Sequence, residues 1–161
     1  MMIGRRYRAP INISTAFTTA IDVFELLAGS SVPLALMGFR LGQTTEIGDA
    51  QEEGLQLVLK QVTGAPTSGS GGGTSTARPV LPNDVAASAT LETGNTTKLT
   101  GGTSVDLDRP VWNIRQDYPL TYVPEMYHVI AGGTRLVLEM VTVPNDSIGG
   151  IFGVIEFMEL V

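Results

Sequence analysis

Two stretches near the end of the chain indicate the fold most strongly: RLVLEMVTV at residues 135–143 and IFGVIEFMELV at residues 151–161. Both are rich in the β-branched, aromatic and long apolar residues that suit a buried strand, and neither has the spacing of an amphipathic helix. Between them, PNDS at residues 144–147 is typical of a turn. The pattern predicts two long strands that pair as an antiparallel hairpin.

Shorter segments earlier in the chain repeat this strand pattern. Alternating side chains predict strands at residues 21–27, 33–41, 55–60 and 87–92. Residues 120–123, which lie between two prolines, predict a short edge strand.

The alternation slips by one residue in the middle of the chain. Val105 and Leu107 hold one phase, whereas Trp112 and Ile114 hold the other. Such a slip reverses the two faces of a strand, so we expect a bulge or a sheet-switching bend near Arg109-Pro110.

Roughly seven to nine short strands with turns between them predict an all-β protein, because no window shows a helical period. We expect an antiparallel β-sandwich of jelly-roll type, with a closed barrel as the alternative. The 161 residues suffice for one domain, which we place at residues 11–161. The chain has no cysteine, so disulfides and thiolate metal sites are excluded.

Residues 64–83 consist almost entirely of Gly, Ser, Thr, Pro and Ala, with a single charge at Arg78. A run of this composition cannot build a core, and long structureless loops usually carry contacts or remain mobile. The sequence therefore predicts a flexible loop that the sandwich displays.

The first ten residues predict an extended N-terminal arm that ends at Pro10. The net charge of the chain is −6, yet Arg5, Arg6 and Arg8 place three positive charges at its start. The arm is either a frayed terminus or a basic strap that becomes ordered on an acidic neighbour. Under the second interpretation, the binding residues are Arg5, Arg6, Tyr7 and Arg8.

The composition disfavours several classes of partner. An acidic chain with few clustered cations is a poor match for nucleic acid. No stretch approaches the roughly 18 apolar residues of a membrane span, and residues 11–22 are too polar to continue a signal peptide. We therefore expect a soluble, unprocessed protein that binds neither nucleic acid nor membrane.

No set of catalytic or cofactor-binding residues assembles in the sequence. His128 is the only histidine, and no nucleophile motif accompanies it. A carbohydrate groove would need aromatic platforms, and Trp112 is the only tryptophan. Two acidic groups, Asp106 with Asp108 and the connection at residues 46–53, could hold a cation or simply be solvated. We expect no enzyme activity, no cofactor and no bound metal.

The last two strands are apolar on both faces, so something must cover their outer side. A loop or the N-terminal arm could do so, and so could a second copy of the chain. We favour self-association. The predicted interface consists of these outward side chains: Val137, Val141, Val143, Phe152, Val154, Met158 and Leu160.

Three segments, DVFEL at residues 22–26, LGQTTEIGDA at residues 41–50 and RLVL at residues 135–138, resemble small virion proteins of tailed bacteriophages. The Gly/Ser/Thr-rich run is also similar to that group. The resemblance implies a non-enzymatic β-sandwich that decorates the capsid exterior as a cement protein and is made in the bacterial cytoplasm. It further implies a homo-oligomer, commonly a trimer, that binds the major capsid protein.

We accordingly expect a trimer that docks on the capsid through its N-terminal arms. The alternative is a head or tail appendage that binds a host surface receptor or glycan through its loops.

Overall fold

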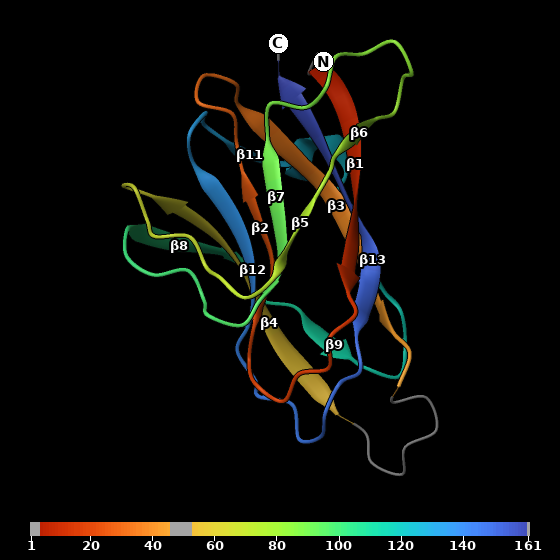
Figure 1. The fold of residues 1–161 in the computed structure, drawn as a ribbon. Helices are drawn as coiled ribbons and strands as arrows, with labels where there is room; N and C mark the ends of the chain where they lie inside the picture. Colours follow the sequence, from red (N-terminus) through yellow and green to blue (C-terminus); the bar gives the residue numbers. More distant parts are fainter. Residues whose placement is uncertain (1–3, 46–52, 161) are drawn as a thin grey trace.

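The computed structural model describes residues 4–45 and 53–160. Within them, two antiparallel sheets pack against each other as a β-sandwich (Figure 1). The six-stranded sheet contains, in spatial order, β10 (Tyr118–Thr121), β3 (Leu34–Gln43), β13 (Ile151–Leu160), β1 (Gly4–Ile13) and β6 (Arg78–Pro79). Its sixth strand, β11 (His128–Ile130), also pairs with β3.

The seven-stranded sheet forms the other layer. Its strands, in spatial order, are β5 (Gly73–Ser75), β7 (Thr90–Asn95), β2 (Asp22–Leu27), β12 (Arg135–Met140), β4 (Gly54–Thr63) and β8 (Thr103–Asp108), and β9 (Val111–Asn113) also pairs with β4. One 3-10 turn, η1 (Pro124–Met126), is the only helical element of the described chain.

The inward side chains of both sheets form one continuous core. Leu36 and Phe157 from the six-stranded sheet and Leu26 and Leu138 from the seven-stranded sheet are fully buried in it. Phe24 and Phe39 meet across the two sheets edge to face, with ring centroids 5.6 Å apart. Burial of apolar surface, without disulfides, therefore holds the two layers together.

The all-β antiparallel sandwich predicted from the sequence is confirmed, and its two separate sheets replace the barrel alternative. The phase slip is also confirmed. β8 and β9 both pair with β4 and are separated by Arg109-Pro110. The β4–β8 register shifts just before this break, between Leu59 and Lys60, which lie opposite Asp108 and Asp106. The jelly-roll type stays a prediction.

The predicted C-terminal hairpin is wrong. β12 lies between β2 and β4 in one sheet, and β13 lies between β3 and β1 in the other. Residues 141–150 cross between the two layers, and Phe17 and Ile148 form a β-bridge beside this crossing. A central strand in each layer has a neighbour on both sides, so a strongly apolar sequence does not require the two strands to pair with each other.

The predicted N-terminal arm is also wrong for residues 4–10. β1 pairs with β13 over its whole length, from Gly4 opposite Leu160 to Ile13 opposite Ile151. Its alternate side chains Tyr7, Ala9, Ile11 and Ile13 are buried in the core. Pro10 fits because β6 pairs only with Tyr7 and Arg8, which leaves β1 an edge strand at that point.

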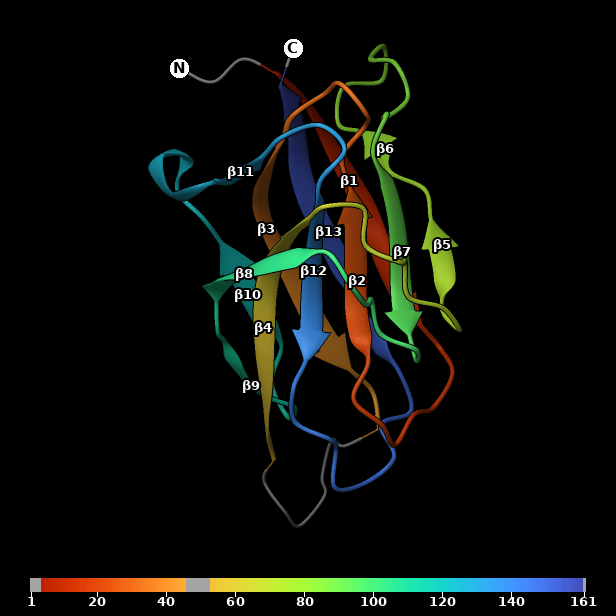
Figure 2. The same cartoon turned by 90° about the vertical axis from the view of Figure 1, so that its left-hand side faces the viewer.

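Residues 64–83 are not a flexible displayed loop. Within this run β5 pairs with β7 and β6 pairs with β1, so the segment joins the two sheets along one side of the sandwich (Figure 2). Two β-bridges, Thr67 with Thr100 and Ser70 with Thr97, fix its first half.

A buried carboxylate completes this attachment. Glu25 of β2 accepts hydrogen bonds from the Ser68 hydroxyl (2.7 Å) and from the Gly69 backbone N–H (3.1 Å). Gly72 lies so close to β7 that an added Cβ would be 2.3 Å from the Thr93 carbonyl oxygen. The glycine run therefore permits close backbone approach, and polar contacts replace the apolar packing that the run lacks.

Candidate functional site

The outer face of the six-stranded sheet carries a row of arginines. In an antiparallel pair, directly opposed residues point to the same face. Arg8 of β1 lies opposite Glu156 of β13 on one side and opposite Arg78 of β6 on the other. Arg40 of β3 lies opposite Val154 of β13, two residues from Glu156. Arg6, two residues before Arg8, points the same way.

These strands border a groove of about 510 Å³. Among the described residues, its lining combines three arginines, Arg6, Arg8 and Arg40, with one carboxylate, Glu156. Apolar and aromatic groups complete it, from Met37, Leu120, Tyr127 and Val154. The groove is therefore cationic with apolar borders, a combination that suits a protein segment rather than a small polar ion.

A chain excursion brings Tyr127 to the groove. β10 pairs with β3 up to Thr121 opposite Gly38, and β11 rejoins β3 at His128 opposite Leu36. The η1 turn lies between them and projects beside β11 (Figure 2). Tyr127 follows directly after η1 and lines the groove.

Two of the groove arginines share one carboxylate. Arg8 Nε lies 2.9 Å from Glu156 Oε1, and Arg6 Nη2 lies 3.7 Å from Glu156 Oε2. The arginine side chains are 58% and 50% exposed. Ion pairs this exposed contribute about 0–1 kcal/mol to stability. The fold therefore does not depend on keeping the two guanidinium groups against Glu156.

The charge of this face opposes that of the whole chain. Arg6, Arg8, Arg40 and Arg78 are four of the ten basic residues of a protein whose net charge is −6. Within residues 4–45 and 53–160, neither Arg40 nor Arg78 forms an ion pair. A local positive potential on an acidic protein is a feature that can orient an acidic partner.

The four residues of the predicted basic strap separate into two groups. Arg6 and Arg8 are exposed and line the groove. Tyr7 is fully buried, so its assignment as a contact residue is wrong: it stacks on Phe157 and donates a hydrogen bond to the Val85 carbonyl (3.0 Å). Burial raises the pKa of the Tyr7 hydroxyl.

Arg5 is partly buried and points to the opposite face of β1 from Arg6 and Arg8. Its partner on β13 is Glu159. The Glu159 carboxylate is itself buried and accepts hydrogen bonds from the Ser88 backbone N–H, the Ser88 hydroxyl and the Ala89 backbone N–H. Arg5 therefore belongs to a structural region and not to the groove.

Sequence reasoning missed Arg40 and Arg78. Arg40 is the one charged residue in strand β3, and Arg78 is the one charge in residues 64–83. Each was a visible exception in its segment. Only the strand register shows that both face the same way as Arg8.

The predicted oligomer interface is dispersed in the structure. Val137 and Met158 are 2% and 7% exposed, so they cannot form a contact surface, and their assignment is wrong. Val154 lines the groove, and Leu160 is partly buried near the end of β13. The remaining three, Val141, Val143 and Phe152, are exposed.

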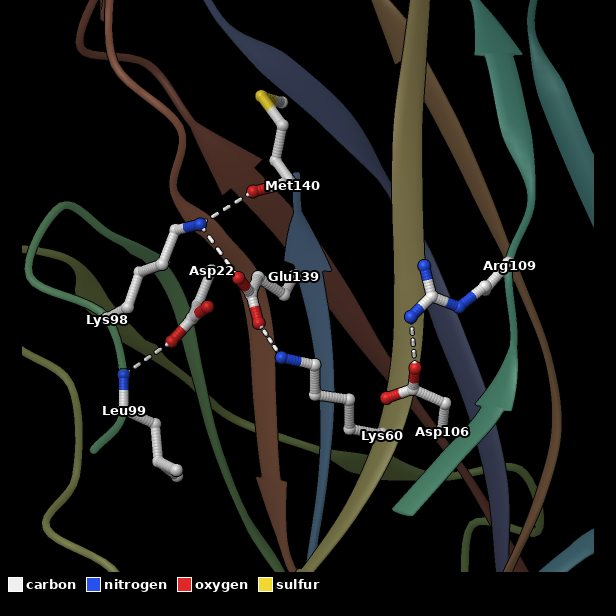
Figure 3. A network of polar contacts seen from close by, with 8 residues as sticks. All are labelled: Asp22, Lys60, Lys98, Leu99, Asp106, Arg109, Glu139 and Met140. Carbon is white, nitrogen blue, oxygen red and sulfur yellow. Dashed lines mark hydrogen bonds and ion pairs between the residues drawn. The ribbon is translucent and has the colours of Figure 1, made fainter. Parts of the chain in front are cut away.

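A loop covers the outer side of Val137. Lys98 Nζ donates hydrogen bonds to Glu139 Oε1 (2.9 Å) and to the Met140 carbonyl (2.7 Å), and the Leu99 N–H donates to Asp22 Oδ2 (2.7 Å) (Figure 3). Lys60 of β4 also pairs with Glu139. This loop accounts for the burial of Val137 on the outer face of β12, and self-association stays a prediction.

The pKa values of the two acids in this network, Asp22 and Glu139, shift in opposite directions. Burial raises the pKa of Asp22 to about 6, although the Leu99 N–H opposes the shift. Burial alone would also raise the pKa of Glu139, but hydrogen bonds from Lys60 and Lys98 outweigh it and lower that pKa. Asp22 is thus a costly buried charge at neutral pH, whereas Glu139 is a well-paired one.

The acidic groups considered for a cation have other partners. Asp106 pairs with Arg109 (Figure 3), and Asp108 accepts a hydrogen bond from the Tyr122 hydroxyl (3.2 Å). In the acidic connection, Glu53 accepts from the Asn145 N–H (2.7 Å), while residues 46–52 lie outside the described residues. Across the described chain, no group of three or more His, Cys, Asp or Glu residues could hold a metal ion.

His128 lies on β11 with its ring edge-to-face on Tyr122, at 4.7 Å between centroids. Burial lowers the pKa of the imidazole, although the charge of Asp108 opposes the shift. Its Nε2 is buried without a hydrogen-bond partner among the described residues, and the side chain does not line the groove. The surroundings of His128 are those of a structural residue.

Comparison with known proteins gives no relative: no family model, no curated protein and no solved structure matches the chain. The part of the chain that the structure describes contains no helix able to cross a membrane.

Proposed function

We propose that the protein is a non-enzymatic structural component of a tailed-bacteriophage virion. In this proposal it is made in the host cytoplasm and decorates the capsid exterior by binding the major capsid protein. The observation that carries the proposal is the arginine-lined groove on the outer face of the six-stranded sheet. In this proposal the groove, and not an N-terminal arm, contacts the major capsid protein.

The chemistry of the groove favours an acidic protein surface as its partner. Guanidinium groups bind carboxylates with directed, charge-assisted hydrogen bonds, and arginine is enriched at protein interfaces. Tyr127 and Val154 add apolar contact area beside Arg8 and Arg40. The rest of the chain is strongly acidic, which disfavours a long polyanion such as duplex DNA.

The rigid sandwich also suits a cement protein. β1 carries Arg6 and Arg8 and pairs with β13 along ten residues, so docking would not require an arm to become ordered. Binding that orders no chain avoids a large entropic cost.

Self-association, with a trimer as the expected form, is part of the proposal. The exposed apolar side chains available for it are Val141, Val143 and Phe152, which lie after β12 and at the start of β13. Several identical grooves on one oligomer would gain affinity through avidity. Mass measurement in solution at micromolar concentration tests this part, and a stable monomer would reject it.

A binding assay tests the docking proposal. Purified protein is mixed with empty capsids and, separately, with host cells, and the bound fraction is measured in the pellet. We expect capsid binding that Arg40→Gln weakens and that Arg109→Gln, a control on the exposed turn after β8, leaves unchanged. Binding to cells and not to capsids would instead support a receptor- or glycan-binding appendage and overturn the proposal.

A further inference from the structure

Glu156 occupies an unusual position in the groove. Among the described residues it is the only acid in the lining, and it lies against Arg6 and Arg8 of β1. We infer that Glu156 is an internal substitute for a carboxylate of the binding partner. In the free protein it engages Arg8 and Arg6, and in the complex an Asp or Glu side chain of the partner takes its place. The inference rests on the proposed function for the identity of that partner.

The contact geometry shows that Glu156 does not saturate its two neighbours. Each guanidinium offers five N–H donors. Only Arg8 Nε is within hydrogen-bond distance of the carboxylate, at 2.9 Å, because Arg6 lies 3.7 Å away. Within the described residues, neither arginine pairs with any other carboxylate. Most of the donors therefore face the groove and the solvent.

Exposure makes an exchange of partners feasible. Glu156 is 28% exposed and the arginines are about half exposed, so water can replace any of the three contacts. The loss of an exposed ion pair costs little, and a new pair with the partner offsets it.

The same geometry favours a carboxylate over a phosphate as the external ligand. The groove already holds a carboxylate between two arginines, and its borders of Met37, Leu120 and Val154 are apolar. A phosphodiester backbone would bring several charges close to Glu156 and to the acidic body of the protein, whereas an acidic peptide segment brings isolated carboxylates with apolar neighbours.

Removal of the negative charge of Glu156 should strengthen binding, although Glu156 lines the groove. Without the carboxylate of Glu156, the donors of Arg8 and Arg6 no longer have an internal competitor. Glu156→Gln should therefore bind an acidic ligand more tightly, and Arg8→Gln should bind it less tightly.

Fluorescence anisotropy with a labelled hexaglutamate peptide tests this prediction on the full-length chain. We expect Glu156→Gln to tighten binding by about fivefold and Arg8→Gln to weaken it by about fivefold. Asp106→Asn on β8 makes the same change in net charge on the other sheet, so it controls for a general electrostatic effect. It should change the affinity by less than about twofold.

Other outcomes would overturn the inference. Equal effects of Glu156→Gln and Asp106→Asn would show that only net charge matters. Weaker binding by Glu156→Gln, repeated in Glu156→Ala and with an unchanged thermal midpoint, would show that Glu156 orients the arginines instead. Tighter binding of a labelled DNA duplex than of the peptide would refute the carboxylate assignment.

Failure of the inference can be distinguished from failure of the proposed function. Peptide binding with the expected pattern, but no capsid binding, would reject the capsid proposal alone. Capsid binding that Arg40→Gln weakens, without any gain in Glu156→Gln, would reject the competitor role alone.

Discussion

The outer faces of the two sheets differ in how far their charged side chains are exposed. On the seven-stranded sheet, Glu139 is shared between Lys60 and Lys98, and the loop that carries Lys98 covers the strands below it. On the six-stranded sheet, Glu156 is shared between Arg8 and Arg6, but no loop of the described chain covers them and a groove remains.

Burial explains the different consequences of these similar motifs. Covered charges are desolvated and must be paired, so they constrain the fold. Exposed charges contribute little to stability and remain available to a partner. The seven-stranded face is therefore a structural surface, and the six-stranded face is the candidate interface.

The largest effect on stability should come from the buried acid Glu25. Its carboxylate pairs with Arg135 and accepts from Ser68 and Gly69, and its side chain is 3% exposed. Glu25→Ala leaves Arg135 without its partner and frees residues 68–69, so we expect a loss of about 3–4 kcal/mol in the free energy of unfolding. Urea denaturation measures it, and a loss below about 1 kcal/mol would contradict the structural role of this face.

The pH dependence of stability should reveal Asp22. Its pKa in the folded state, about 6, lies above its ordinary value of 3.8. The folded state therefore binds this proton more tightly, and the resulting stabilisation is complete below pH 3.8 and is lost as the pH rises through 6. The shift corresponds to about 3 kcal/mol over the whole range, of which roughly half is reached at pH 5.

Asp22→Asn isolates this contribution, because Glu139 and His128 titrate in both proteins. We expect the variant to be at least as stable as the wild type at pH 7.5, and its advantage should shrink as the pH falls to 5. Parallel stability curves for the two proteins would contradict the buried position of Asp22.

Two valines of the predicted interface lie on the two faces and should respond differently to truncation. Val137 is buried beneath the loop of the seven-stranded face, whereas Val154 lines the open groove. Val137→Ala should cost about 2 kcal/mol and leave capsid binding intact. Val154→Ala should cost less than about 1 kcal/mol and weaken binding. Thermal melting and the pellet assay separate the two, and equal stability losses would contradict the assignment.

The smallest stability effect should come from Glu156. Because its two ion pairs are exposed, Glu156→Ala should change the free energy of unfolding by less than about 1 kcal/mol. Urea denaturation beside Glu25→Ala gives the contrast directly. A loss comparable to that of Glu25→Ala would show that the groove charges serve the fold.

Local sequence patterns predicted much of the sandwich. Alternation located β2, β3 and β4, apolar content located β12 and β13, and the phase slip at Arg109-Pro110 located the break between β8 and β9. β1 also alternates, with Tyr7, Ala9 and Ile11 inward, but the intervening arginines and Pro10 concealed this signal.

Long-range features were not accessible to the same reasoning. Glu25 lies 43 residues from Ser68 and 110 residues from Arg135, so no local pattern indicates that it anchors the Gly/Ser-rich run. The groove likewise requires the register of β1, β13 and β3, which places Arg6, Arg40 and Glu156 on one face. Alternation predicts that a strand forms, but not which sheet receives it.

Protection of an introduced thiol shows whether the groove is the surface that contacts the capsid, because the chain has no cysteine of its own. Val154→Cys places a unique thiol in the groove, and Ser104→Cys places one on the exposed strand β8 of the other sheet. The rate of thiol alkylation is measured for each variant, free and bound to capsids. The groove account predicts that capsids protect Val154→Cys and leave Ser104→Cys reactive; protection of Ser104→Cys alone would contradict it.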